Sequence, residues 1–433
     1  MGGDQQDSGI LAGRILSALY LALVLSTVSI TAWGQTTEPG QLGDDPSEDG
    51  TDKPTEFAEA DQTDTSTNED PEAARRAKRP LESPDAFGKL EYNFYGSVRL
   101  HAIKAFDTGS GESEQSLGDG ASRVGVSAEW QLKGKWNLFG RLESGFDVLE
   151  TFTTTGQSDT DSLLTPRLYY FGIESDALYL KLGKSWSAYY QVAGAADRFS
   201  IFGGNATGIY NAGTDGGATG TGRADNAVQT RTYINLGNSS ILKPFNLNLQ
   251  YQHGEPIPKV KGATYGSTYS LSAWLETERE LGIGLAWHEA KIGEIERPEL
   301  SKAGISGDAR ALAVAFKTYG QDWLASLVFS RLENIETTDQ FLYFDGTGAE
   351  LFAQWQFRDR WWLAGGGNYL DPDSDDPDAG QYQIRYLVLG VRYTFDSFNR
   401  MLYAEWRDDY GKLADGTRRG NEVTVGFRWD FGY

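Results

Sequence analysis

Apolar and polar residues alternate with a period of two along the chain from about Leu90 to Tyr433. The pattern is clearest at residues 124–132, 245–252 and 423–433. In the second of these segments, Phe245, Leu247, Leu249 and Tyr251 are separated by Asn246, Asn248 and Gln250. Because successive side chains of a strand point to opposite faces, this period with one apolar face predicts β-strands.

The alternating segments can be counted along the chain, and there are sixteen of them. The predicted strands start near residues 90, 121, 135, 166, 177, 226, 243, 267, 279, 308, 321, 348, 360, 381, 400 and 420. Short links such as 133–135 contrast with long polar links such as 107–120 and 150–165. An even number of strands with unequal links is typical of a closed antiparallel barrel. Sixteen strands are enough to leave a water-filled interior.

Composition indicates that this barrel lies in a membrane. Aromatic residues make up 13% of the chain, yet the mean hydropathy is −0.46. A membrane barrel accounts for both values, because apolar side chains face lipid while polar ones face water. In a soluble β-sandwich or propeller, the apolar stripe at 423–433 would promote aggregation, and no blade repeat is visible. The sequence therefore predicts an all-β fold, a sixteen-stranded antiparallel transmembrane β-barrel, at residues 87–433.

The first 86 residues differ from the rest of the chain. Residues 15–30 form an apolar core followed by small residues at Ala32 and Gly34, which predicts a signal peptide at residues 1–34. The alternative is a short anchor helix that stays attached. Residues 35–86 contain 15 acids and 5 bases and few apolar side chains. We therefore expect a disordered acidic periplasmic tail or linker at 35–86.

Charge and residue types exclude several classes of function. The net charge of −22 argues against a nucleic-acid partner. The chain has no cysteine, and His101, His253 and His288 are isolated, so we predict no metal site and no cofactor. An outer-membrane enzyme is the alternative class, but these histidines lack nearby catalytic partners, and we predict no catalytic residue and no enzymatic activity.

Three short motifs resemble the general diffusion porins of Gram-negative outer membranes. They are Phe94-Tyr95-Gly96, Ser122-Arg123-Val124-Gly125 and the C-terminal segment Phe427-Arg428-Trp429-Asp430-Phe431-Gly432-Tyr433. The terminal residue is Tyr where the family more often has Phe. A long insertion after residue 187 contains Asp197-Arg198-Phe199 and Phe202-Gly203-Gly204-Asn205 and ends near Asn226. This insertion resembles the family's infolded third external loop, which narrows the pore.

The resemblance implies a function, a location and partners. The protein is expected to be a porin of the cell outer membrane, surrounded by outer-membrane lipid and assembled as a homotrimer. Small hydrophilic solutes and ions would cross its water-filled pore by passive diffusion. A solute-specific channel for sugar or anion uptake is the alternative, and a purely structural or adhesion barrel is less favoured because it would not need the loop.

Candidate pore residues follow from strand parity and from the resemblance. If Phe94 and Val98 face lipid, then Arg99 faces the interior, and the same argument places other basic residues there. The predicted wall residues of the constriction are Arg99, Arg123, Arg141, Arg167, Lys181 and Arg231. By resemblance, Arg123, Arg167 and Arg231 match the family's constriction arginines, and the loop acids are Asp197, Asp215 and Asp225. The alternative is that these are ordinary solvated residues, and Asn205, where an acid is common, leaves the ion preference open.

Overall fold

The computed structural model describes most of the chain after residue 88. The described residues are 79–81, 89–106, 114–132, 135–149, 164–176, 178–234, 242–293, 297–374, 376, 378–396 and 399–432. All of them belong to one compact unit, Pro54–Tyr433. The predicted signal peptide and the predicted tail, apart from Arg79–Leu81, lie outside the described residues. In the described part, no helix has the length and apolar character needed to cross a membrane.

Strands dominate this unit. They are β1 (Arg79–Leu81), β2 (Lys89–Phe106), β3 (Glu114–Asp119), β4 (Arg123–Gln131), β5 (Asn137–Gly145), β6 (Thr165–Glu174), β7 (Tyr179–Trp186), β8 (Arg223–Ile234), β9 (Phe245–His253), β10 (Tyr265–Glu276), β11 (Leu281–Ile292), β12 (Ala309–Tyr319), β13 (Trp323–Thr337), β14 (Tyr343–Arg358), β15 (Trp361–Pro372), β16 (Ile384–Asp396), β17 (Arg400–Asp409) and β18 (Asn421–Phe431). The short helices are α4 (Tyr190–Ala193), the 3-10 turn η1 (Gly194–Ala196) and α5 (Arg297–Lys302).

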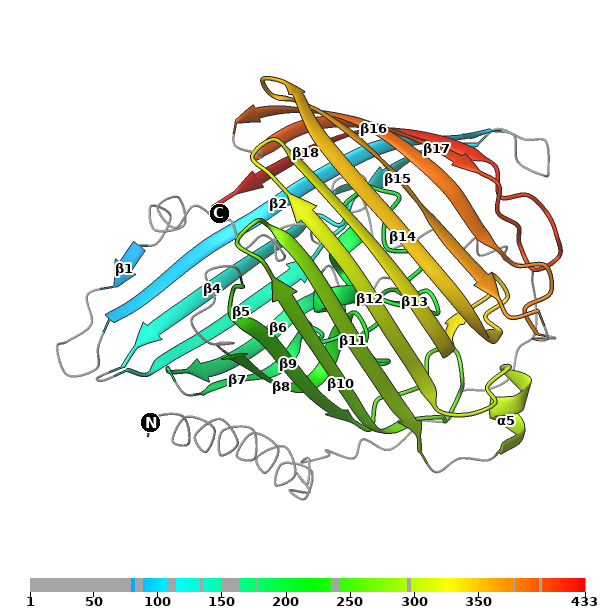
Figure 1. The fold of residues 1–433 in the computed structure, drawn as a ribbon, viewed down its shortest axis with the longest axis horizontal. Coiled ribbons are helices and arrows are strands. Elements are labelled where there is room, and N and C mark those ends of the chain that lie inside the picture. Colours follow the sequence, from blue (N-terminus) through cyan, green and yellow to red (C-terminus); the bar gives the residue numbers. More distant parts are fainter. Residues whose placement is uncertain are drawn as a thin grey trace, which may run out of the picture. The chain divides into compact units, whose positions relative to one another are not determined.

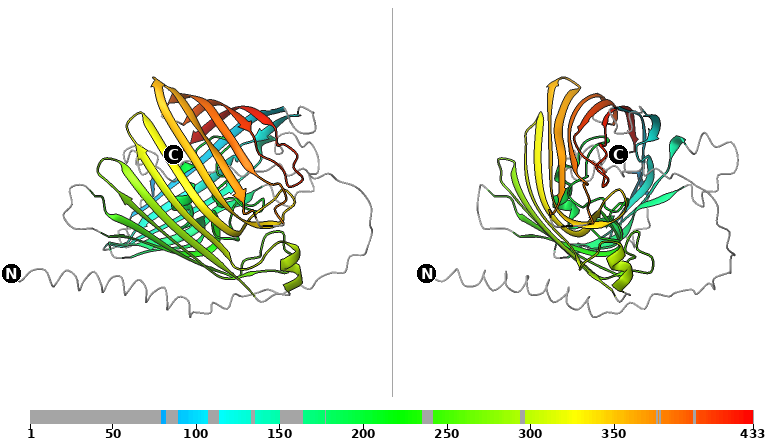
Figure 2. Two further views of the ribbon diagram at one scale, coloured as in Figure 1. Left: turned by 45° about the vertical axis from the view of Figure 1, so that its right-hand side comes forward. Right: turned by 90° about the vertical axis from the view of Figure 1, so that its right-hand side faces the viewer.

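The strands form one closed antiparallel sheet (Figures 1 and 2). The ring closes where β18 pairs with β2, from Asn421 opposite Phe106 to Phe431 opposite Gly96. Two of the eighteen strands, β1 and β3, are short and pair with parts of β2 that β18 and β4 leave free. The remaining sixteen strands are the barrel that the sequence predicts. Arg79–Leu81, which fall within the predicted tail, thus form a short strand of the sheet.

The predicted strand starts agree with the observed ones to within a few residues. The largest difference is at β14, which begins at Tyr343 and not near residue 348. A register shift between Leu332 and Glu336 lies opposite this start, and Tyr343 and Phe344 are both buried. Burial on both faces removes the period-two pattern, so the beginning of β14 could not be recognised by alternation.

The two faces of the sheet have different chemistry, as β11 illustrates. Its outward residues are Leu281, Ile283, Leu285 and Trp287, with exposed fractions between 39% and 49%. Its inward residues are small or polar, among them Ala286 and the buried His288. Apolar side chains exposed on the outside of a closed barrel form a surface suited to lipid.

The long connections at one end of the barrel contact one another. The Tyr343 hydroxyl donates to the carbonyl oxygen of Pro258 at 2.8 Å, and the Tyr343 amide donates to the carbonyl oxygen of Ala303 at 2.8 Å. The Ala414 amide donates to the carboxyl of Asp339 at 2.8 Å. These bonds join the start of β14 to the connections that follow β9 and β11, and the connection after β17 to the one after β13.

Candidate functional site

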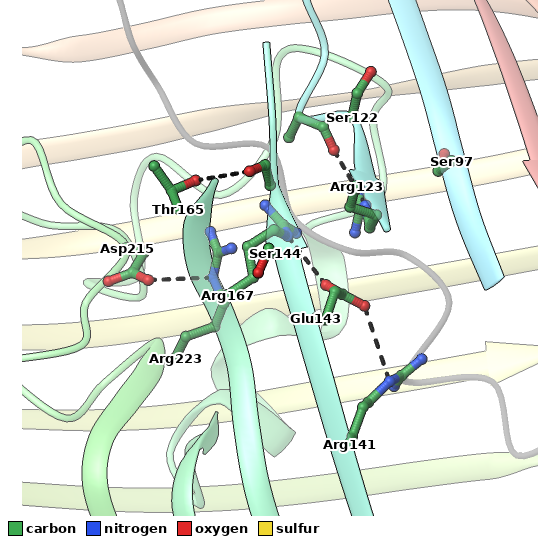
Figure 3. A network of polar contacts seen from close by, with 12 residues as sticks. Ser97, Ser122, Arg123, Arg141, Glu143, Ser144, Thr165, Arg167, Asp215 and Arg223 are labelled. Carbon is green, nitrogen blue, oxygen red and sulfur yellow. Dashed lines mark hydrogen bonds and ion pairs between the residues drawn. The ribbon is translucent and has the colours of Figure 1, made fainter. Parts of the chain in front are cut away.

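Arginines gather around a buried carboxylate on the inward face of β5 and β6 (Figure 3). Glu143 has no exposed surface, and its Oε1 lies 3.1 Å from Arg167 Nε. Its Oε2 lies 3.9 Å from Arg141 Nε and accepts a hydrogen bond of 2.9 Å from the Tyr95 hydroxyl. The Arg141 guanidinium also stacks 4.6 Å from the centre of the Tyr95 ring. One acid thus fixes the positions of two of the predicted wall arginines, Arg141 and Arg167.

The next two predicted wall residues lie on the neighbouring strands β2 and β4. Arg99 Nε donates to Ser97 Oγ at 2.8 Å, and Ser97 Oγ donates to Asp430 at 2.5 Å. Arg123 is fully buried, and its Nε donates to the carbonyl oxygen of Ala121 at 3.1 Å. Ser97 and Arg123 are direct partners in the β2–β4 register. The structure therefore brings Arg99 and Arg123 onto one inward patch.

Residues 187–222, here called the β7–β8 segment, connect β7 to β8 and contain two of the predicted loop acids. Asp215 lies 2.9 Å from Lys184 Nζ and 3.5 Å from Arg223 Nε. Asp225, the third predicted acid, lies in β8 and pairs with the same Lys184 at 2.6 Å. Burial raises the pKa of the Asp215 carboxyl, but the charges of Arg223 and Lys184 lower it more, so this pKa lies below its ordinary value. Asp215 is therefore ionised at neutral pH.

Asp197, the remaining predicted acid, is enclosed by the β7–β8 segment itself. It is 3% exposed, and its carboxyl packs against Gly203 and Gly204. Burial raises the pKa of this carboxyl to about 7, although Tyr210, Arg198 and other neighbours lower it. Such a group does not present a permanent charge to water.

The raised pKa of Asp197 predicts that the β7–β8 segment loosens as the pH rises. The folded pKa of about 7 exceeds the ordinary 3.8, so the stabilisation is fully present below pH 3.8 and declines as the pH rises towards 7. In amide hydrogen exchange corrected for intrinsic rates, the protection of residues 187–222 should fall by up to about tenfold per pH unit across this range. In Asp197→Asn the part of the pH dependence that Asp197 causes should be absent, so the protection should fall less steeply over the same range. An identical pH dependence in both proteins would exclude Asp197 as its source.

Hydrogen bonds connect the backbone of the β7–β8 segment to buried carboxylates on inward-facing positions of β14 and β17. The amide of Ala206 donates to Glu350 at 2.7 Å. The amides of Ser200 and Ile201 donate to the two oxygens of Glu405 at 2.6 and 3.0 Å. Further bonds run from Trp274 Nε1 to the carbonyl oxygen of Gln191, from Ser326 Oγ to that of Ala195, and from Ser330 Oγ to that of Ala206. The segment is therefore held by several strands of the wall.

Lys181 and Arg231, the last two predicted wall residues, lie on β7 and β8. They line a cavity together with Tyr179, Gln229 and Asn248. The Arg231 guanidinium stacks 4.3 Å from the centre of the Tyr179 ring. These two cations are thus inward-facing, as parity predicted.

Several charged residues of this site were not singled out from the sequence. Glu143 is two residues from Arg141 on the same strand face, so parity could have identified it. Lys184 follows Gly183, whose positive φ of 118° accompanies a register shift that breaks the parity of β7. Glu350 and Glu405 are far from the segment in sequence, and no local pattern links either of them to it.

Basic residues outnumber acids in this part of the inward face. The basic residues are Arg99, Arg123, Arg141, Arg167, Lys181, Lys184, Arg223, Arg231 and Arg428, and the acids are Glu143, Asp215, Asp225 and Asp430. Nine positive and four negative groups give a local charge of about +5 at neutral pH. No group of three or more His, Asp or Glu side chains suited to a metal ion occurs among the described residues.

Comparison with solved structures finds the same fold in outer-membrane proteins. Salmonella typhi OmpF in complex with daunomycin matches with a TM-score of 0.62 and 16% identity, over 81% of this chain and 100% of that one. An anion-selective porin from Comamonas acidovorans matches with a TM-score of 0.59 and 16% identity, over 79% of this chain and 100% of that one. OmpT of Vibrio cholerae matches with a TM-score of 0.54 and 18% identity, over 82% of this chain and 100% of that one. No curated protein sequence matches the chain.

A closed antiparallel barrel with a lipid-suited outer face and a charged inner face defines a membrane-spanning channel. The Gram-negative porin family matches residues 82–432, and the chain belongs to this family. It is a non-enzymatic channel of the Gram-negative outer membrane through which solutes cross by passive diffusion.

Proposed function

We propose that the β7–β8 segment is the infolded third external loop of this porin and that it narrows a pore favouring small anions. The hydrogen bonds from the segment to Glu350 and Glu405 support the position, because both acceptors are buried inward-facing residues. The observation that carries the ion preference is the local charge of about +5, since rings of charged side chains bias which ions pass.

Within this proposal the predicted residues take different roles. Arg99, Arg123, Arg141 and Arg167 form the basic wall of the constriction, with Glu143 holding two of them in place. Asp215 of the segment and Asp225 of β8 are the acids of the constriction, and each is paired with a neighbouring cation. Because Asp197 is closed off from water, its role is to stabilise the loop and not to attract cations.

We further propose that the protein acts as a homotrimer, as the family resemblance implies. A trimer form is named for OmpT of Vibrio cholerae, which shares the fold at 16% identity and a TM-score of 0.52. The barrel presents apolar side chains around its outer face, as at Phe94 and Phe171, and such a surface can face either lipid or a second copy.

The test is conductance of the purified full-length protein in a planar bilayer with a salt gradient. A water-filled pore gives large ohmic steps, and a trimer gives these steps in threes. The basic constriction gives a reversal potential with the sign expected for a pore that passes anions more readily than cations. A cation-selective reversal potential would overturn the proposed ion preference. Ohmic steps that occur singly would overturn the trimer and leave the diffusion pore in place.

A further inference from the structure

The cavity beside the β7–β8 segment has a chemical character of its own. It has a volume of about 50 Å³ and is lined by Tyr179, Lys181, Gln191, Gln229, Arg231 and Asn248, with no acid among its lining residues. One water molecule needs about 10–15 Å³ of such space, so the cavity takes a group of a few atoms, the size of a carboxylate or phosphate.

Arg231 is held in the cavity wall by aromatic rings and not by an acid. Its guanidinium stacks 4.3 Å from the Tyr179 ring centre and 5.4 Å from that of Tyr233. No ion pair of Arg231 occurs among the described residues, and its buried Nε has no hydrogen-bond partner there. A guanidinium without an acid keeps its full charge for a ligand and matches the geometry of a carboxylate or phosphate.

Lys181 adds a second cation to the same cavity. Its Nζ lies 5.2 Å from the centre of the Tyr170 ring. The rings of Tyr170 and Tyr179 both flank Phe139, at centroid distances of 6.4 and 5.3 Å. The two cations are therefore presented side by side on an aromatic surface, an arrangement that binds an anionic group and packs against the apolar face of its carrier.

The amide side chains of the cavity supply hydrogen-bond acceptors. Gln229 Nε2 donates to the carbonyl oxygen of Trp186 at 3.0 Å and to Gln250 at 2.9 Å. Asn248 Nδ2 donates to Ser272 Oγ at 3.3 Å. With these amide nitrogens engaged, the amide carbonyl oxygens of Gln229 and Asn248 are the groups that a ligand can use. A ligand that satisfies them must donate hydrogen bonds, as hydroxyl groups do.

We propose that this cavity is a binding subsite for small hydroxylated organic anions, such as sugar acids or sugar phosphates, on their way through the pore. Arg231 and Lys181 bind the anionic group, and the amide carbonyls of Gln229 and Asn248 accept from the hydroxyls. The inference rests on the proposed function in one respect, namely that the cavity opens to the path of diffusing solutes. It goes further by giving the channel a preferred class of solute.

Lys317 on β12 provides a matched comparison. Its Nζ lies 4.4 Å from the centre of the Trp274 ring, just as the cavity cations lie over tyrosines. Its charge, however, is paired with Glu276 at 2.6 Å. Lys317 therefore has the same aromatic support, but its charge is paired with an acid, and its replacement tests for a general effect of removing a cation.

The experiment measures block of single-channel current by gluconate, glucose 6-phosphate and neutral glucose. Both anions should interrupt the current of the wild-type protein and glucose should not. Arg231→Gln should weaken block by about tenfold or more, and adding Lys181→Gln should abolish it, whereas Lys317→Gln should keep it. Block by gluconate alone or by glucose 6-phosphate alone identifies carboxylate or phosphate as the preferred group.

Other results would overturn the proposal in recognisable ways. Equal block by glucose would show an aromatic sugar site, and equal weakening in Lys317→Gln would show a general field effect. Ordinary conductance without block by either anion would reject the subsite and leave the diffusion pore intact. If no conductance is seen, titration calorimetry of gluconate into the detergent-solubilised protein still decides, because absence of binding there rejects the subsite independently of transport. Arg231→Lys, which keeps the charge, should retain part of the affinity.

Discussion

The double replacement Glu350→Ala and Glu405→Ala is expected to release the β7–β8 segment and to raise both the conductance and the open-channel noise. The two carboxylates accept hydrogen bonds from the amides of Ser200, Ile201 and Ala206. Each buried amide left without an acceptor costs about 1–3 kcal/mol, so three cost roughly 3–9 kcal/mol. A segment held to the wall by a few such bonds does not stay docked against that cost.

Single-channel recording, together with the heat-dependent gel mobility of the folded barrel, checks this prediction. Glu333→Ala is the matched control, because this acid lies on β13 and pairs with Arg310 and Arg331 rather than with the segment. Glu350→Gln with Glu405→Gln keeps the acceptor oxygens and should have a smaller effect. An unchanged conductance in a correctly folded alanine variant would contradict the proposed position of the segment in the solute path.

A glycine on the wall gives an independent perturbation of the same contact. A Cβ added at Gly348 would overlap the carbonyl oxygen of Ala206, so Gly348→Ala should push the segment away and also raise the noise. At Gly365, on the adjacent strand, the added Cβ would make ordinary contacts with the tip of Leu389 at 3.4 Å and the carbonyl oxygen of Val388 at 3.8 Å. Gly365→Ala should therefore leave the current unchanged.

The barrel could be predicted from the sequence because a membrane barrel encodes each strand locally. Every strand has one face in lipid and one towards water, so alternation marks its course, as in β11. Because tight turns between strands need few residues, the alternating segments could be separated along the chain and counted as strands. The prediction weakened where both faces are buried, at Tyr343 and Phe344, and where a register shift interrupts parity, at Gly183.

The charged site was only partly predictable, because parity gives the face of a side chain and not its partner. It placed Arg99, Arg123 and Arg141 inward, as the structure does. Parity gave no information on the β7–β8 segment, because apolar and polar residues do not alternate regularly there. The burial of Asp197 depends on how that segment folds on itself, and the bonds to Glu405 join residues some two hundred positions apart.

The double replacement of Arg123 and Arg141 with alanine is expected to move the reversal potential in a salt gradient towards cation preference. It removes two positive charges, so the local charge falls from about +5 to about +3, and the field that repels cations from the inner wall weakens. Arg123→Lys with Arg141→Lys keeps the charge and should keep the wild-type potential, even though it loses the hydrogen bonds to Ala121 and Tyr95.

Two further comparisons make the charge argument specific to the inner wall. Arg310→Ala removes a cation from the outward face of β12, where the side chain is 52% exposed and paired with Glu289, and it should leave the potential unchanged. Raising the salt concentration should reduce the difference between wild type and the alanine variant, because mobile ions screen fixed charges over about 10 Å at 0.1 M and about 3 Å at 1 M. If the lysine variant shifts as far as the alanine variant, the shape of the wall and not its charge sets the preference.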